Sequence, residues 1–322
     1  MSDPLPFIYR TSQLYGWPFY VARKAMRATA ARLLAAADGL SAREKYPVPF
    51  FLRPLLPANA RLQNAQRGRR CFVIGNGPSL AAQNIEPLRD EVTFAMNGFV
   101  NHPAIHRIKP TYYCLVDPSY FDGSIPSETF LDRLFAEVSE SRFILPYSAA
   151  QKLLARRGFP ADRATFVAFA GNLATACTPR IDLTRPLPQI QNCAQLAIMV
   201  ATYVGCSPIY LLGMDHDWAA HRGTETHFYP QKTLANHPVA HGEWDRYPYL
   251  AILEDALKVW RGYQALKRRA EAMGLQIINA SRGGFLDVFH RADYESLISA
   301  NHDRRSRSNS RASQSRTMQR GS

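Results

Sequence analysis

Short polar residues and glycines follow a run of strand-forming residues in CFVIGNGPSL, over 71–80. The loop in this segment comprises Gly75, Asn76, Gly77, Pro78 and Ser79. Glycines let a backbone turn sharply and bring its N–H groups to a ligand, and proline suits the first turn of a helix whose N-terminus favours an anion. The spacing is neither that of a Walker loop nor that of a dinucleotide fingerprint. The segment predicts a loop that binds a phosphate or nucleotide, with a plain strand-to-helix turn as the alternative.

Four further apolar runs end in residues of the same kind. These ends carry Asn97, Asp117, Asp215, and the pair Asn279 and Ser281. In an open sheet of parallel strands, ligands collect where the carboxyl ends of the strands meet. The five ends together predict one polar site, built from amides and short carboxylates, that binds a nucleotide.

Histidines are concentrated in one segment, because five of the nine lie between 216 and 241. Histidine titrates near neutral pH, so this segment could supply a general acid or base. His237 and His241 have a spacing that can bind a metal on a helix, but Pro238 and Gly242 argue against a helix there, and no metal site is predicted. The segment predicts a long lid or binding loop, with a solvated loop as the alternative.

The elements that must position these residues alternate between strand and helix. The expected strands are 71–75, 92–97, 110–117, 142–146, 208–215 and 275–280, and the expected helices are 78–89, 127–140, 192–205 and 249–274. Such alternation is typical of an α/β protein with a mostly parallel sheet. We therefore expect a Rossmann-like fold, flanked by helices and carrying the histidine-rich lid.

The net charge of +13 lies at the two ends of the chain. Residues 1–70 carry 12 basic and 3 acidic side chains, 303–322 carry 6 arginines and one aspartate, and 71–302 have a net charge of −1. We expect three parts: a basic helix and proline-rich linker (1–69), a catalytic nucleotide-binding domain (70–301) and a disordered Arg/Ser tail (302–322). A nearly neutral domain argues against a nucleic-acid enzyme, although a non-catalytic nucleotide- or RNA-binding protein stays open.

Residues 12–38 interleave apolar residues with Arg23, Lys24 and Arg27, and aromatic residues precede them. Such a helix could pack on the domain with a solvated basic face, or lie on an anionic membrane surface. The sequence shows no secretory signal, no apolar run long enough to span a bilayer, and no CxxC pair among its five cysteines. We expect a cytoplasmic protein, with the inner face of the plasma membrane as a candidate partner.

Four segments carry a resemblance to a known superfamily: VIGNGPSL, FAMNGF, LVDPSYF and QNCAQLAIMVATYVGCSPIYLLGMD. They resemble the MptE-like domain, the related bacterial sialyltransferases of glycosyltransferase family 42, and flagellin-modifying glycosyltransferases, over roughly 70–300. The resemblance to the sialyltransferases implies a domain that binds a CMP-sugar without an essential metal. By position, it implies that Asn76 and Asn97 contact the nucleotide, that Tyr229 holds the leaving phosphate, and that His241 is the general base.

The chain also departs from the sialyltransferases. Asp117 stands where they carry Asn, Ile190 where they carry Arg and Cys193 where they carry Ser, which argues against sialic acid as the donor sugar. The MptE-like diphosphokinases instead move diphosphate from ATP to a pterin alcohol, with Mg²⁺ that Asp117, Asp215 and Asp217 could hold. The favoured prediction is a glycosyltransferase that moves a sugar from a CMP donor to a cell-surface glycan or lipid-linked acceptor. The diphosphokinase stays as the alternative.

Overall fold

An eight-stranded sheet forms the centre of the molecule in the computed structural model, which describes residues 54–176, 178–221, 227–229, 248–299 and parts of 19–33. Its strands are β1 (Cys71–Ile74), β2 (Val92–Met96), β3 (Tyr112–Cys114), β4 (Arg142–Pro146), β5 (Ala164–Val167), β8 (Ile209–Leu212), β9 (Ile277–Asn279) and β10 (His290–Arg291). Each strand pairs in parallel with its neighbours, so all carboxyl ends lie at one edge.

The strand order reverses at β1. The sheet runs β10-β9-β8-β1-β2-β3-β4-β5, so the chain builds one half outward from β1 to β5 and then crosses to β8 on the other side of β1. In doubly wound sheets, ligands bind in the crevice beside such a switch point. The predicted Rossmann-like α/β fold is confirmed, and its switch point lies between β1 and β8.

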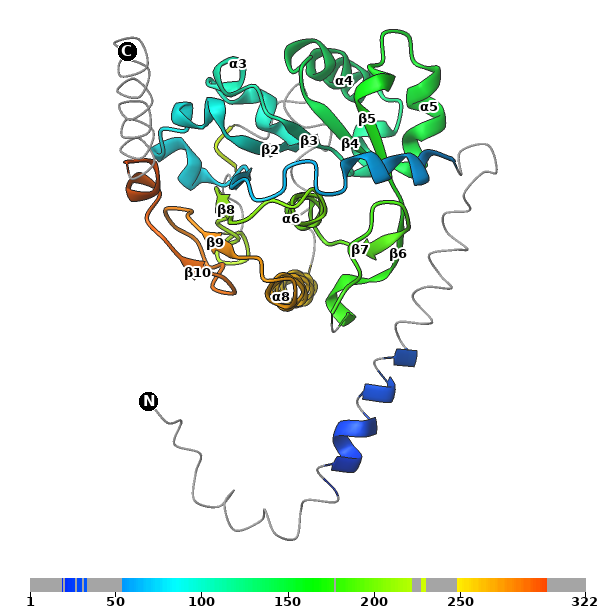
Figure 1. The fold of residues 1–322 in the computed structure, drawn as a ribbon, viewed down its shortest axis with the longest axis vertical. Coiled ribbons are helices and arrows are strands. Elements are labelled where there is room, and N and C mark those ends of the chain that lie inside the picture. The colour runs from blue at the N-terminus through cyan, green and yellow to red at the C-terminus, as the bar shows by residue number, and fades with distance from the viewer. Residues whose placement is uncertain are drawn as a thin grey trace, which may run out of the picture.

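Helices cover both faces of the sheet (Figure 1). One face carries α6 (Cys193–Tyr203) and α8 (Tyr249–Ala272), and the other carries α3 (Ile105–Ile108), α4 (Ile125–Glu137) and α5 (Ala150–Ala155). Every residue of α6 is buried, as expected of a helix that is apolar all round and packs between the central strands and α8. The two apolar layers hold the strand ends rigidly in place.

The proline-rich segment packs on the domain where it is described. The turn η2 (Pro57–Leu62) buries Asn59, whose amide donates hydrogen bonds to the carbonyl oxygens of Phe166 (2.8 Å) and Leu183 (2.9 Å). These bonds tie η2 to β5 and to the chain that leads into a small second sheet of β6 (Phe169–Asn172) and β7 (Leu187–Gln189).

The expected helix over 78–89 is wrong. The segment forms two 3₁₀ turns, η3 (Pro78–Ala82) and η4 (Glu86–Asp90), because Pro87 would remove a hydrogen bond inside a continuous helix. The other 3₁₀ turns are η5 (Asn97–Asn101), η6 (Pro118–Phe121), η7 (Tyr147–Ala149), η8 (Ala161–Arg163) and η9 (Leu173–Thr175). No helix in the described part of the chain is both long and apolar enough to cross a bilayer.

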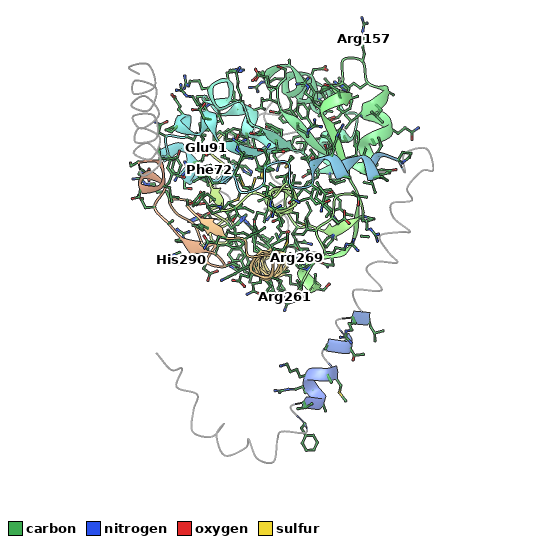
Figure 2. All side chains as sticks on the ribbon, in the orientation of Figure 1. Phe72, Glu91, Arg157, Arg261, Arg269 and His290 are labelled. Carbon is green, nitrogen blue, oxygen red and sulfur yellow. The ribbon has the colours of Figure 1, made fainter. Side chains whose placement is uncertain are left out.

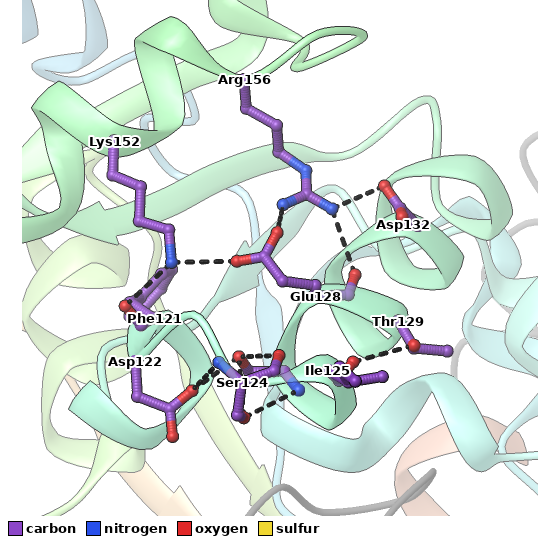
Figure 3. Close-up of polar contacts among 10 residues, drawn as sticks. Phe121, Asp122, Ser124, Ile125, Glu128, Thr129, Asp132, Lys152 and Arg156 are labelled. Carbon is purple, nitrogen blue, oxygen red and sulfur yellow. Dashed lines mark hydrogen bonds and ion pairs between the residues drawn. The ribbon is translucent and has the colours of Figure 1, made fainter.

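An ion cluster ties α4 to α5 at the surface (Figure 3). Glu128 on α4 forms an ion pair with Lys152 and accepts a hydrogen bond from Arg156, which also bonds to Asp132 at 2.6 Å. The bonds from Lys152 and Arg156 lower the pKa of the Glu128 carboxyl. These residues lie beside β4 and β5, away from the switch point, and their role is structural.

Candidate functional site

The loops after β1 and β8 pack directly against each other at the switch point. The Gly75 amide donates to the Leu212 carbonyl (2.8 Å) and the Gly77 amide to the Gly213 carbonyl (2.9 Å). A Cβ atom on Gly75 would lie 2.5 Å from the Gly213 oxygen, and one on Gly77 would lie 2.5 Å from a carboxylate oxygen of Asp215. Both glycines are therefore required for the approach of the two loops.

The Asp215 carboxylate fills the position at which this loop could have held an anion. It accepts hydrogen bonds from the Ser79 amide (2.8 Å) and the Ser79 hydroxyl, in the first turn of η3. Asp215 is only 5% exposed. Ser79 and Asp215 were both predicted to bind the nucleotide, and in this structure they bond to each other.

The end of β9 is also internally satisfied. Asn279 is fully buried, donates to the Leu286 carbonyl (2.9 Å) and accepts from the Ser281 amide (3.0 Å). The Ser281 hydroxyl accepts from the Met214 amide at 2.9 Å. Asn279 and Ser281 therefore hold the ends of β8 and β9 together.

The ends of β1 and β2 differ, because they carry polar atoms without partners. Asn76 is 7% exposed and donates to the Met96 carbonyl (3.1 Å), which leaves its side-chain oxygen buried and unpartnered. Asn97 adopts a left-handed backbone (φ 49°), and its side-chain oxygen is also buried and unpartnered. The Tyr229 hydroxyl is the third such atom. We call these residues the Asn76–Asn97–Tyr229 cluster.

Tyr229 reaches this cluster from the histidine-rich segment. The Phe228 amide donates to the Asn76 carbonyl (2.9 Å), and the Tyr229 ring lies so close to Gly98 that any side chain there would overlap it. Burial raises the pKa of the Tyr229 phenol, and the nearby Gly98 N–H offsets only part of this rise. The geometry of that N–H contact is not that of a hydrogen bond, so the hydroxyl has no partner. The phenol is therefore neutral near pH 7 and can donate a hydrogen bond.

Of the other two predicted catalytic residues, only Asp117 is described, and it does not join this cluster. Asp117 is exposed and accepts from the Ser119 amide (2.9 Å) and hydroxyl (2.7 Å) as the N-cap of η6. Among the described residues, no hydrogen bond or ion pair links it to Asn76 or Asn97. His241 lies outside the described residues, as does most of the predicted lid.

A hydrogen-bonded chain beside the switch point was not predicted from the sequence. His216 follows Asp215 with a left-handed backbone (φ 48°), and its Nε2 shares a 2.7 Å hydrogen bond with the Tyr263 hydroxyl. That hydroxyl lies 3.3 Å from the Asn192 side-chain oxygen, at the N-terminus of α6. Burial lowers the pKa of His216 to about 4, so the ring is neutral near pH 7. The position of His216 directly after a buried strand end was the available signal.

The carboxylates expected to hold Mg²⁺ do not form a metal site. Asp215 is bonded to Ser79, Asp117 to Ser119, and Asp217 lies 3.5 Å from His221. Within the described ranges, no three His, Cys, Asp or Glu side chains gather where a metal could bind. The described carboxylates therefore do not form a site that could hold Mg²⁺ by protein ligands alone.

Comparison of the chain with known protein families identifies one match. A family model described as 6-hydroxymethylpterin diphosphokinase MptE-like matches residues 52–221. No curated protein matches the chain.

Two solved structures are similar in fold. One is the sialyltransferase CstII from Campylobacter jejuni in complex with a substrate analogue, cytidine-5′-monophosphate, with 15% identity, 70% of this chain and 86% of that chain covered, and a TM-score of 0.42. The other is the MAf glycosyltransferase from Magnetospirillum magneticum AMB-1, with 14% sequence identity and a TM-score of 0.39. That match covers 78% of this chain and 40% of the glycosyltransferase chain. The family match spans more than half of the chain and includes the loops after β1, β2, β3 and β8, and this chain belongs to the MptE-like family.

Proposed function

We propose that the chain is a transferase whose Asn76–Asn97–Tyr229 cluster binds the nucleotide of a donor, and that the group it moves is a sugar. The observation that carries this proposal is that three residues in contact with the ends of β1 and β2 each keep a buried oxygen atom without a partner. Each buried polar atom without a partner costs about 1–3 kcal/mol, so three in one place indicate partners that arrive with a ligand.

The chemistry of the cluster suits a nucleotide. The two amide oxygens accept hydrogen bonds, which ribose hydroxyls or the amino group of a base can donate. The neutral Tyr229 phenol can donate to a phosphate oxygen, and such a donor stabilises the charge that grows on a departing nucleoside phosphate. The resemblance of the sequence to sialyltransferases suggests CMP as that nucleotide.

A base is needed to take the proton of the acceptor hydroxyl, and His241 remains our candidate for it. Because a base acts on the acceptor, we expect His241→Asn to keep CMP affinity within about twofold and to lower turnover of a CMP-sugar by at least about 100-fold. Titration calorimetry and a coupled CMP-release assay measure the two quantities. Loss of CMP affinity, or full turnover, would remove His241 from this role.

Diphosphate transfer from ATP is the second candidate, and the description of the matching family favours it. That reaction uses Mg²⁺ between the protein and the phosphates. It ranks second because the described carboxylates are bonded to Ser79 and Ser119 and do not converge.

A thermal-shift screen tests the choice between sugar transfer from a CMP donor and diphosphate transfer from ATP. CMP, CDP, UDP, GDP and ATP are each added to the full chain, with Mg²⁺ or with EDTA. We expect CMP to raise the melting temperature equally in both conditions, and Tyr229→Phe to remove most of that rise. Tyr249→Phe is the matched control, since Tyr249 is exposed at the start of α8. A rise with ATP and Mg²⁺ alone would favour the diphosphokinase.

We also propose that the basic helix near the N-terminus binds an anionic membrane. Phe19, Met26 and Leu33 are exposed and recur every seven residues, which places them on one side of a helix, next to Arg23 and Lys24. The full chain should co-sediment with vesicles of anionic lipid and should stay in the supernatant with vesicles of neutral lipid. Met26→Asp combined with Leu33→Asp should abolish the sedimentation, and unchanged sedimentation of that variant would refute the proposal.

A further inference from the structure

A pocket of about 460 Å³ opens at the carboxyl ends of β9 and β10. Its polar lining comprises Gln83, Ser281, Arg282, Arg291, Asp293 and Glu295. Of these, only Ser281 belongs to the predicted nucleotide site, and its hydroxyl is already bonded to Met214. The pocket is therefore separate from the Asn76–Asn97–Tyr229 cluster.

The wall of this pocket contains a buried acceptor without a partner. Gln83 is 5% exposed, and its amide nitrogen donates to the Ala280 carbonyl at 3.0 Å. That bond fixes the orientation of the amide, and the side-chain oxygen is left buried and unpartnered. A ligand hydroxyl or amino group would satisfy it.

Two arginines are held over the same pocket by backbone carbonyls. One terminal nitrogen of Arg291 donates to the carbonyls of Gly283 (2.6 Å) and Gly284 (3.1 Å), and the other donates a long bond to that of Ser281 (3.5 Å). One terminal nitrogen of Arg282 donates to the Ala82 carbonyl (3.0 Å). A guanidinium has five N–H donors in a planar fork, so each arginine retains donors that suit a carboxylate or a phosphate. Both side chains are thus oriented in advance of ligand binding.

Acidic side chains complete the lining. Asp293 accepts from the Ser296 amide (2.8 Å) and hydroxyl (2.7 Å), which lower its pKa, and Arg282 lowers it further. The Asp293 and Glu295 carboxylates can accept hydrogen bonds from hydroxyl groups, as the Gln83 oxygen can. The pocket therefore offers donors for one anionic group and several acceptors for hydroxyls.

We propose that this pocket binds an anionic sugar, with its carboxylate or phosphate on Arg282 and Arg291 and a ring hydroxyl on the Gln83 oxygen. β1 and β9 both flank β8, so the pocket lies about 10 Å along the sheet edge from the end of β1. The turn η3 begins in the Gly75–Ser79 loop, and Gln83 follows its last residue directly. In the proposed reaction the bound sugar is the acceptor, and only this last assignment rests on the proposed function.

Titration calorimetry on the full chain, without nucleotide, tests the pocket. The probes are glucuronate, glucose 6-phosphate, glucose and inorganic phosphate. We expect glucuronate and glucose 6-phosphate to bind, and glucose and inorganic phosphate to bind at least about tenfold more weakly. The two sugar anions distinguish a carboxylate from a phosphate as the preferred group.

Variants assign the binding to named atoms. Arg282→Gln, at an exposed side chain, and Gln83→Leu should each weaken binding of the better sugar anion by at least about tenfold. Arg157→Gln is the matched control and should change nothing, because Arg157 is exposed and lies across the molecule from His290 of β10 (Figure 2). Equal weakening by Arg157→Gln would overturn the proposal.

Further results separate the pocket from the proposed function. Tyr229→Phe should leave sugar binding unchanged, and Arg282→Gln should leave CMP binding unchanged. Sugar binding without CMP binding would refute the nucleotide site and support the pocket. The pocket proposal would be overturned if neither sugar anion bound the wild-type chain. It would also be overturned if inorganic phosphate bound as tightly as the sugar anions and Gln83→Leu had no effect.

Discussion

The carboxyl ends of β1 and β2 and those of β8 and β9 carry the same types of residue, but the structure uses them differently. Asp215 and Asn279, at the β8–β9 end, have their polar atoms hydrogen-bonded within the protein. Asn76 and Asn97, at the β1–β2 end, each keep a buried oxygen without a partner. The residue types at the two ends are alike, and the buried atoms without partners distinguish the β1–β2 end, where we propose that the ligand binds.

The largest expected effect is on stability at the β8–β9 end. Asp215→Ala leaves the Ser79 amide and hydroxyl without their charged acceptor, and should lower the free energy of unfolding by about 3 kcal/mol. Asp117→Ala, which removes an exposed N-cap, should cost only about 1 kcal/mol. Urea denaturation measures both. If Asp215→Ala kept full stability but lost CMP binding, the β8–β9 end would bind the ligand, and the proposed difference between the two ends would be wrong.

The pH dependence of stability should come partly from His216. Its pKa in the folded state is about 4, below the usual value near 6.5, so the unfolded chain binds the proton first as the pH falls. Stability should therefore decline from about pH 6.5 to pH 4, by about 2 kcal/mol because partial exposure reduces the effect.

His216→Gln is the comparison for this prediction. Unfolding free energies at pH 7, 5.5 and 4 should fall less steeply in the variant than in the wild-type chain. His102, whose pKa is also lowered by burial and by Arg107, titrates in both proteins and cancels in the difference. Parallel pH profiles would show that the partly buried His216–Tyr263 bond does not depend on a neutral ring.

Asn279→Ala sharpens the contrast further, since Asn279 and Asn76 are both buried asparagines at strand ends. Removing Asn279 breaks two hydrogen bonds and should cost about 2 kcal/mol, with CMP affinity unchanged. Removing Asn76 breaks one and should cost about 1 kcal/mol, with CMP affinity at least about tenfold lower. Urea denaturation gives the two stability changes, and titration calorimetry gives the two CMP affinities. If Asn279→Ala lowered CMP affinity and Asn76→Ala did not, the roles of the two ends would be exchanged.

The smallest effect is expected in the ion cluster between α4 and α5. Arg156→Ala should cost about 1 kcal/mol, because Arg156 bonds to both Glu128 and Asp132. Arg157→Ala, at the next and exposed position, should cost nothing measurable. Neither should affect CMP binding, and a loss of binding in either variant would extend the site to this face.

The sequence predicted the fold and the positions of the polar strand ends, because local apolar periodicity and glycine placement determine both. The family resemblance also pointed to Asn76, Asn97 and Tyr229 as nucleotide contacts, but it did not predict that their oxygens would be buried without partners. The sequence did not predict that Asp215 bonds to Ser79, since those residues are 136 positions apart and their pairing depends on the strand order. The pocket around Gln83 was missed for the same reason, since Gln83 lies 197 positions before Ala280, to which it bonds.

The most direct test of the central claim is titration of CMP into Asn97→Gly in the presence of EDTA. Glycine accepts the left-handed backbone at position 97, so the variant removes the unpartnered side-chain oxygen without straining the turn. We predict that the wild-type chain binds CMP and that Asn97→Gly binds it at least about tenfold more weakly, with an unchanged unfolding free energy. Equal CMP affinity in both proteins, or no CMP binding by the wild-type chain, would contradict the assignment of the ligand site to the β1–β2 end.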